Sequence, residues 1–182
     1  YGINFERFAI SIFHPVTTEN HLIESQINDL VRALLDSGHN YVVIGPNNDL
    51  GNEMIRSRLS TLTSQNRFRF LPSMRFEHYL SLLNKCEFII GNSSSGVREA
   101  PFLGVPSINI GSRQLRRNTE SPSIVNVSSD FEELRTAIES IGSKRFPGDK
   151  VFGDGKSGTR FKKLIVQGFF NQSSPQKIFF EV

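Results

Sequence analysis

Short apolar runs alternate with longer amphipathic segments along most of this chain. Six of the runs are rich in Ile, Val and Phe and suit strands that are buried on both faces of a sheet. These runs lie at residues 8–13, 41–44, 68–71, 87–90, 107–110 and 124–127. Segments with apolar residues at helical spacing lie at 19–36, 52–63, 75–84, 97–103, 130–141 and 159–170, and in the third of them Phe76, Tyr79, Leu80 and Leu83 are expected to face inward. The alternation predicts an α/β protein with a doubly wound parallel sheet, Rossmann-like in architecture.

The usual strand order of such a sheet also predicts where a ligand binds. In the order 3-2-1-4-5-6 the first and fourth strands are neighbours, and the crevice opens between their carboxyl ends. The loop that begins at His14 follows the first strand, and the segment 91–96 follows the fourth. We therefore expect both to border one cleft.

The segment 91–96, Gly-Asn-Ser-Ser-Ser-Gly, is here called the serine turn. Its residues tolerate unusual backbone angles and offer hydroxyl groups. A helix is expected directly after it, ended by Gly104 and Pro106. Free backbone N–H groups at a helix N-terminus, the helix dipole and the hydroxyls of Ser93 and Ser94 together predict a site for an anion such as a phosphate.

Two charged residues extend this prediction from a phosphate to a nucleotide. Glu99 falls in the first turn of the expected helix, where its carboxylate suits a ribose diol. The alternative is a carboxylate that only complements the helix dipole. Arg113 leaves the carboxyl end of the fifth strand, where a guanidinium can pair with two phosphate oxygens. Arg116 and Arg117 are more simply explained as solvated surface charges.

Three motifs carry a family resemblance. The stretch Gly-Asn-Ser-Ser-Ser-Gly-Val-Arg-Glu at residues 91–99, the Gly-Val-Pro break at 104–106 and Gly-Ser-Arg-Gln at 111–114 resemble the signature of the hydrolysing UDP-N-acetylglucosamine 2-epimerases. The serine turn and the segment 112–117 favour this branch over the non-hydrolysing bacterial epimerases, which typically show Asp-Ser-Gly-Gly and Thr-Glu-Arg-Pro-Glu instead. The family starts sialic acid and related nonulosonic acid pathways.

The resemblance implies one domain of a two-domain enzyme of the GT-B type. Residues 1–170 would form the UDP-binding C-terminal domain and residues 171–182 a tail, while the N-terminal catalytic domain lies outside this chain. The histidine of the family's His-Pro-Val-Thr-Thr-Glu motif lies in the active site, and His14 matches it. The implied substrate-binding residues are Asn47, Met74, Ser93, Ser94, Glu99 and Arg113.

The implied reaction eliminates UDP from UDP-N-acetylglucosamine and adds water to the resulting glycal, which gives N-acetylmannosamine. Its catalytic carboxylates belong largely to the N-terminal domain, so we expect this chain alone to bind UDP weakly and to be inactive. The expected partners are UDP, UDP-N-acetylglucosamine or a related UDP-sugar, and further copies of the full-length enzyme in a homo-oligomer. We expect no cofactor and no metal.

Other interpretations stay open at this point. His14 alone could cap a loop, and Asn47 alone could fill a turn, which asparagine does readily. A GT-B glycosyltransferase or a non-catalytic nucleotide-sugar binding module would place UDP against the same cleft. A glycosyltransferase would require an acceptor for turnover, whereas a hydrolysing epimerase would not.

Composition bounds these choices. The 182 residues are 37% hydrophobic, enough for one domain with a core, and the formal net charge is only +3. Because the basic residues are spread along the chain, they favour a small anionic ligand over nucleic acid. The single cysteine, Cys86, is expected to be a small buried hydrophobe. No membrane span or signal peptide is visible, which predicts a cytoplasmic protein, and Tyr1 suggests a piece of a longer one.

Overall fold

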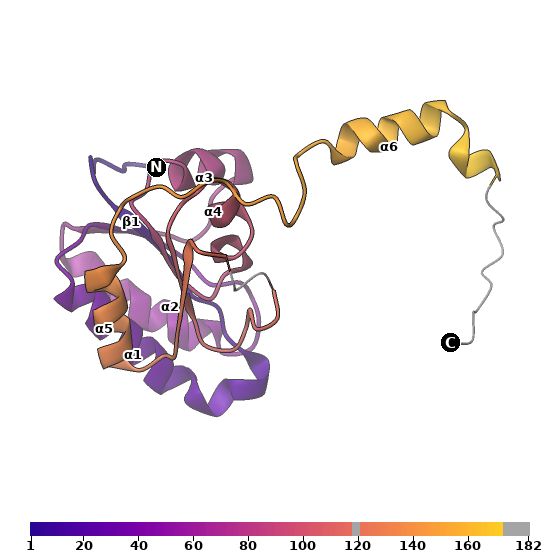
Figure 1. The fold of residues 1–182 in the computed structure, drawn as a ribbon. Helices are drawn as coiled ribbons and strands as arrows, with labels where there is room; N and C mark the ends of the chain where they lie inside the picture. The colour runs from indigo at the N-terminus through magenta and orange to yellow at the C-terminus, as the bar shows by residue number, and fades with distance from the viewer. Residues whose placement is uncertain (118–120, 173–182) are drawn as a thin grey trace. The chain divides into compact units, whose positions relative to one another are not determined.

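A six-stranded parallel sheet forms the centre of the computed structural model, which describes residues 1–117 and 121–172 (Figure 1). The strand order is β3-β2-β1-β4-β5-β6, and every neighbouring pair is parallel. The strands are β1 (Ala9–Ile12), β2 (Tyr41–Ile44), β3 (Phe68–Leu71), β4 (Ile89–Gly91), β5 (Ser107–Ile110) and β6 (Ile124–Val127). The predicted doubly wound sheet and its strand order are therefore confirmed.

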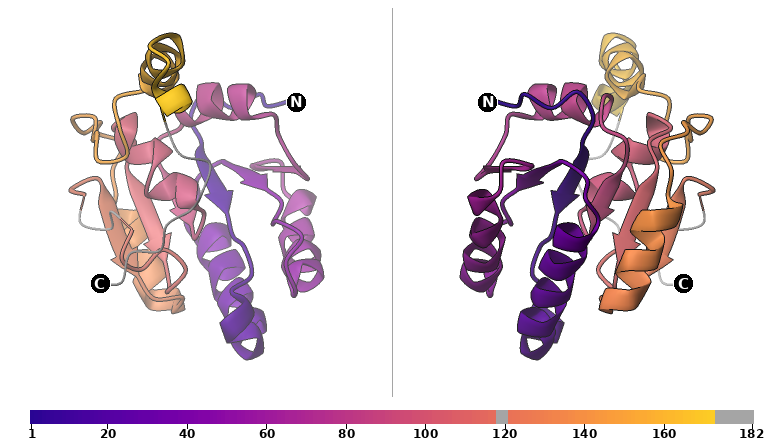
Figure 2. Two further views of the ribbon diagram at one scale, coloured as in Figure 1. Left: turned by 90° about the vertical axis from the view of Figure 1, so that its right-hand side faces the viewer. Right: turned by 90° about the vertical axis from the view of Figure 1, so that its left-hand side faces the viewer.

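Helices cover both faces of this sheet (Figures 1 and 2). On one face, α1 (Ile23–Asp36) lies between α2 (Asn52–Ser60) and α5 (Phe131–Ser140), and their apolar residues share one core cluster. On the other face, α3 (Phe76–Leu83) and α4 (Glu99–Phe102) contribute to a second cluster. Cys86 belongs to this second cluster, and burial raises the pKa of its thiol to about 12, as suits a structural cysteine.

Several predicted helices differ from those observed. The segment 19–36 begins with a 3-10 helix, η1 (Thr17–Leu22), and α1 starts only at Ile23, because Glu19 has non-helical backbone angles. After the serine turn the chain forms a 3-10 helix, η3 (Ser94–Gly96), and then α4, which has four residues. A further 3-10 helix, η2 (Thr61–Ser64), follows α2. Phe76, the first residue of α3, is 58% exposed, so its prediction as an inward-facing residue is wrong.

Gly91 allows β1 and β4 to approach closely at their carboxyl ends. Its φ is +142°, and a Cβ atom there would lie 1.9 Å from the backbone oxygen of Ile12. The next N–H group, that of Asn92, donates to the same oxygen over 3.2 Å. Glycine is thus required at the carboxyl ends of the two central strands, where the loops that follow them begin.

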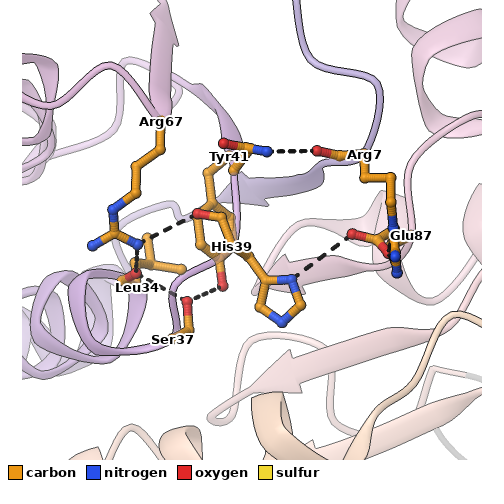
Figure 3. A network of polar contacts seen from close by, with 8 residues as sticks. Arg7, Leu34, Ser37, His39, Tyr41, Arg67 and Glu87 are labelled. Carbon is orange, nitrogen blue, oxygen red and sulfur yellow. Dashed lines mark hydrogen bonds and ion pairs between the residues drawn. The ribbon is translucent and has the colours of Figure 1, made fainter.

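The amino-terminal end of the sheet holds a separate polar network (Figure 3). The guanidinium of Arg7 donates to the Glu87 carboxylate, and His39 Nδ1 lies 3.8 Å from that carboxylate. Arg67 donates to the backbone oxygens of Leu34 and His39. These contacts tie the segments that enter β1, β2, β3 and β4 at the end of the sheet opposite to the serine turn.

The chain divides into two compact units, Tyr1–Asp149 and Lys150–Val182. The second contains α6 (Ser157–Val166), none of whose residues is buried, and η4 (Phe169–Gln172). The domain end predicted at residue 170 lies inside this second unit, and the predicted tail from residue 173 lies outside the described residues. In the ranges that the structure describes, no helix is long and apolar enough to cross a bilayer.

Candidate functional site

A pocket of about 290 Å³ opens at the carboxyl ends of β1 and β4, where the loops that follow these strands begin. Five of the seven predicted site residues line it, namely His14, Met74, Ser93, Ser94 and Glu99. The other lining residues are Ile12, Ile44, Gly45, Phe76, Tyr79 and Ser95. The predicted proximity of the His14 loop to the serine turn is thus confirmed.

His14 is held as a neutral hydrogen-bond donor. Its Nδ1 accepts a hydrogen bond from the backbone N–H of Asn47 over 3.0 Å, so the proton of the neutral ring is on Nε2. Burial, and to a smaller extent the charge of Arg113, lower the pKa of His14 to about 4, against the opposing effect of Asp49. At neutral pH the ring therefore carries no charge, and its Nε2–H can donate to a ligand oxygen.

Asn92 fixes the backbone of His14 from the neighbouring strand. The Oδ1 atom of Asn92 accepts from the His14 N–H over 2.7 Å, and its Nδ2 donates to the His14 carbonyl over 2.8 Å. The side-chain amide thus replaces the peptide group of a neighbouring strand at the point where the β1–β4 ladder ends. As a result, His14 leaves β1 in a fixed direction.

Arg113 and Gln114 reach the same asparagine from the loop after β5. Arg113 Nη1 donates to the backbone oxygen of Asn92 over 3.2 Å, and Gln114 Nε2 donates to it over 2.9 Å. Gln114 is fully buried, whereas Arg113 is partly exposed. Burial lowers the pKa of Arg113, an effect that Asp49 opposes, but a guanidinium stays charged at neutral pH. A positive charge is therefore held beside His14, although Arg113 is not part of the pocket lining.

The serine turn is built differently from the predicted helix N-terminus. The N–H groups of Ser95, Gly96, Val97 and Arg98 all donate to Ser93 or Ser94. The prediction of free N–H groups at the start of a helix over 97–103 is wrong for these four, because the chain forms a 3-10 turn before the short α4. Ser93 and Ser94 nevertheless line the pocket.

Asn47 contacts His14 through its backbone, whereas its side chain contacts Asp49. Its N–H supports His14, while its Nδ2 donates to Asp49 Oδ2 over 2.5 Å. The side chain is therefore engaged within its own turn, which is the simpler of the two interpretations of this residue.

Several residues of the site were not singled out from the sequence. The hydroxyl groups of Tyr79 and Ser95 share a buried hydrogen bond beneath the pocket, which supports the serine turn from α3, and burial raises the pKa of Tyr79. The Glu19 carboxylate accepts hydrogen bonds from Ser112 and from Gln26. Glu19 belongs to the motif that carries His14, which is the signal that could have drawn attention to it. Among the described residues, no three or more His, Cys, Asp or Glu side chains form a group that could hold a metal ion.

Proteins of known family resemble this chain in sequence. The family model described as UDP-N-acetylglucosamine 2-epimerase matches residues 2–166. The chain belongs to this epimerase family. It is 40% identical over 186 residues to the UDP-N-acetylglucosamine 2-epimerase of Neisseria meningitidis serogroup B, which covers 100% of this chain and 49% of that protein. It is 36% identical over 148 residues to the polysialic acid biosynthesis protein P7 of Escherichia coli, 80% of this chain and 38% of that protein.

Solved structures of epimerases share the fold. The UDP-GlcNAc 2-epimerase of Methanocaldococcus jannaschii superposes with a TM-score of 0.69 at 20% identity, over 91% of this chain and 47% of that one. A second structure of that enzyme is a complex with UDP-GlcNAc and UDP, with a TM-score of 0.68 over 90% of this chain and 46% of that one, again at 20% identity. This likeness confirms a Rossmann-like domain of the GT-B type. The chain spans about half the length of the N. meningitidis and M. jannaschii epimerases.

Proposed function

We propose that this chain is the UDP-binding half of a hydrolysing UDP-N-acetylglucosamine 2-epimerase. One observation carries the proposal: His14, Ser93, Ser94 and Glu99 line one pocket at the carboxyl ends of the two central strands. That is where doubly wound sheets bind their ligands. The family membership supports a nucleotide-sugar as the class of ligand.

The diphosphate would lie between His14, the serine hydroxyls and Arg113. Neutral His14 donates through Nε2–H, and Ser93 and Ser94 donate through their hydroxyls. The Arg113 guanidinium adds a positive charge that remains when the sugar departs. Pulling a proton from C2 of a sugar is difficult because no adjacent ketone makes that carbon acidic. The step therefore depends on a good leaving group, and preorganised donors and charge make UDP a better one.

The nucleoside would occupy the more apolar side of the pocket. The Glu99 carboxylate accepts hydrogen bonds from ribose hydroxyls, as an acidic residue does in dinucleotide-binding folds. Met74 contributes its backbone beside the uracil, and the exposed ring of Phe76 at the rim offers a face for the base. These polar and apolar contacts together suit a uridine diphosphate.

The hydrolysing branch is supported by the motifs of the serine turn and of the loop after β5, and by the names of relatives. The UDP-N,N'-diacetylbacillosamine 2-epimerase (hydrolyzing) of Legionella pneumophila is 26% identical over 91% of this chain. The E. coli polysialic acid protein favours a sialic acid pathway. In this branch UDP is eliminated from UDP-N-acetylglucosamine, and one water molecule then adds to the glycal to give N-acetylmannosamine.

An activity assay of the full-length enzyme tests the proposed reaction. Incubation with UDP-N-acetylglucosamine and no acceptor should release free N-acetylmannosamine and UDP in equal amounts. UDP-N-acetylmannosamine as the product would place the enzyme in the non-hydrolysing branch. Turnover that requires an acceptor would instead identify a glycosyltransferase, and no turnover in either assay would leave a binding module.

A binding experiment on the present chain tests the assignment of the UDP site. Calorimetric titration with UDP should show weak binding, and UDP-N-acetylglucosamine should not be consumed, because the catalytic carboxylates belong to the other domain. A chain that is folded but does not bind UDP at millimolar concentration would contradict the assignment of the pocket.

A further inference from the structure

We propose that Asn92 is the positioning residue that holds His14 and Arg113 against the same diphosphate. The inference rests on the proposed function, because it assigns a role within the UDP site. Asn92 is 1% exposed and is not part of the pocket lining, so it acts on a ligand only through the residues that it holds.

Each polar atom of Asn92 has a partner that bears on the site. The side-chain amide binds the N–H and the carbonyl of His14 over 2.7 and 2.8 Å. The backbone oxygen accepts from Arg113 Nη1 over 3.2 Å and from Gln114 Nε2 over 2.9 Å. The backbone N–H donates to Ile12 over 3.2 Å. One buried residue on the β4 side therefore connects the loop after β1 to the loop after β5.

This role requires an amide in the side chain. The His14 N–H needs an acceptor and the His14 carbonyl needs a donor, and only a side chain with both groups at one end serves the two together. A carboxylate of the same shape would keep the first contact. It would also set an oxygen against the His14 carbonyl at the distance that Nδ2 now occupies, 2.8 Å, where two acceptors repel.

The division of contacts between the side chain and the backbone of Asn92 has a measurable consequence. The side-chain amide binds His14, whereas Arg113 binds the backbone oxygen, which every side-chain variant keeps. Replacing the Asn92 side chain should therefore remove part of what His14 contributes to UDP binding. The loss caused by Asn92→Asp should then shrink in a chain that already lacks His14 and persist in one that lacks Arg113. A residue that only stabilises the fold would lower the UDP affinity by the same factor in every background.

The experiment measures UDP affinity by NMR titration in a set of variants. We expect Asn92→Asp to weaken UDP binding by about ten-fold in the parent chain and beside Arg113→Ala, and by about three-fold or less beside His14→Ala. Asn92→Ser, which is smaller and uncharged, should show the same pattern. Asn109→Asp is the matched control, because Asn109 is a buried amide on β5 opposite Gly91 that donates to Asn126. It should leave UDP affinity unchanged.

NMR signals of the parent chain test the same inference without any substitution. On addition of UDP, the Asn92 side-chain amide signals and the His14 ring signals should shift with one titration curve, while the Asn109 amide signals stay in place. Asn92 signals that do not respond, or Asn92→Asp binding UDP as tightly as the parent, would overturn this inference alone. A folded parent that does not bind UDP would overturn the proposed function and this inference with it.

Discussion

The hydroxyl of Ser112 donates a hydrogen bond to the carboxylate of Glu19, across 93 residues of sequence. Glu19 lies in the loop that His14 begins, and Ser112 immediately precedes Arg113. Gln26 Nε2 donates to the second carboxylate oxygen over 3.0 Å. The two loops that carry the proposed diphosphate ligands are therefore joined at a second point, beyond the contacts that Asn92 makes.

Glu19→Gln is expected to weaken UDP binding by about three- to ten-fold, because a neutral amide accepts a weaker hydrogen bond from Ser112 than a carboxylate does. Calorimetry measures the affinity, and thermal unfolding checks that the fold persists. The matched control is Glu24→Gln, since Glu24 is an exposed carboxylate on α1 that pairs with Arg58 away from the pocket. Equal affinities of the two variants would argue against the link between the loops.

Arg113→Ala and Glu99→Ala should each weaken UDP binding by about 1–3 kcal/mol, as expected for the loss of a charge-assisted contact. The Arg113 variant should lose more affinity for UDP than for uridine, whereas the Glu99 variant should lose affinity for both. Arg116→Ala serves as the control, because Arg116 is an exposed cation of the same loop. If both variants bind UDP as the parent does, the two assignments are wrong.

Acid should destabilise the chain through His14. The unfolded state takes up a proton near pH 6.5, while burial keeps the folded-state pKa at about 4. The unfolded state thus binds more protons between these values, and the free energy of unfolding falls as pH falls through this window. His14 should account for about 2–3 kcal/mol of the loss between pH 7 and pH 4.

Urea unfolding at several pH values measures this effect, with His14→Gln as the comparison. The variant cannot take up the proton, so its stability should fall less steeply over the same range. Parallel pH profiles for parent and variant would contradict a buried neutral His14.

Gly91→Ala should unfold the chain or destabilise it by about 3 kcal/mol or more, because the new methyl group would meet the Ile12 oxygen and force β1 and β4 apart. Gly38→Ala is the control. Gly38 has a φ of +71° and no described heavy atom within 4 Å of the added Cβ, so only backbone strain of about 1 kcal/mol is expected. Thermal unfolding compares the two, and similar losses would contradict the close approach at Gly91.

The sequence predicts the sheet well because β1, β2, β4 and β5 are buried along their whole length and are mostly apolar, while the edge strands β3 and β6 are partly exposed. The strand order then brings His14 and the serine turn together without further information. Helix limits are harder to predict. The short α4 contains Pro101 and is followed by Gly104, whose positive φ ends it, so the apolar spacing of 97–103 overstates the helix.

The supporting contacts of the site are not predictable from local pattern. Asn92 reaches His14 across 78 residues, and Ser112 reaches Glu19 across 93. In the sequence Asn92 is only one of several small polar residues in a turn, and nothing local distinguishes it from Ser93. Which side chain turns inward depends on the exact approach of β1, β4 and β5, and that approach is a property of the folded sheet.

The two ends of the sheet have different roles, one structural and one in forming the pocket. Arg7, Glu87 and His39 tie the strands at one end, and the pocket is formed by loops at the other. Because the polar network lies at the end of the sheet opposite to the serine turn, a substitution of a pocket residue such as Glu99 removes none of its contacts. The lining of the pocket can therefore change while the network that ties the strands is kept.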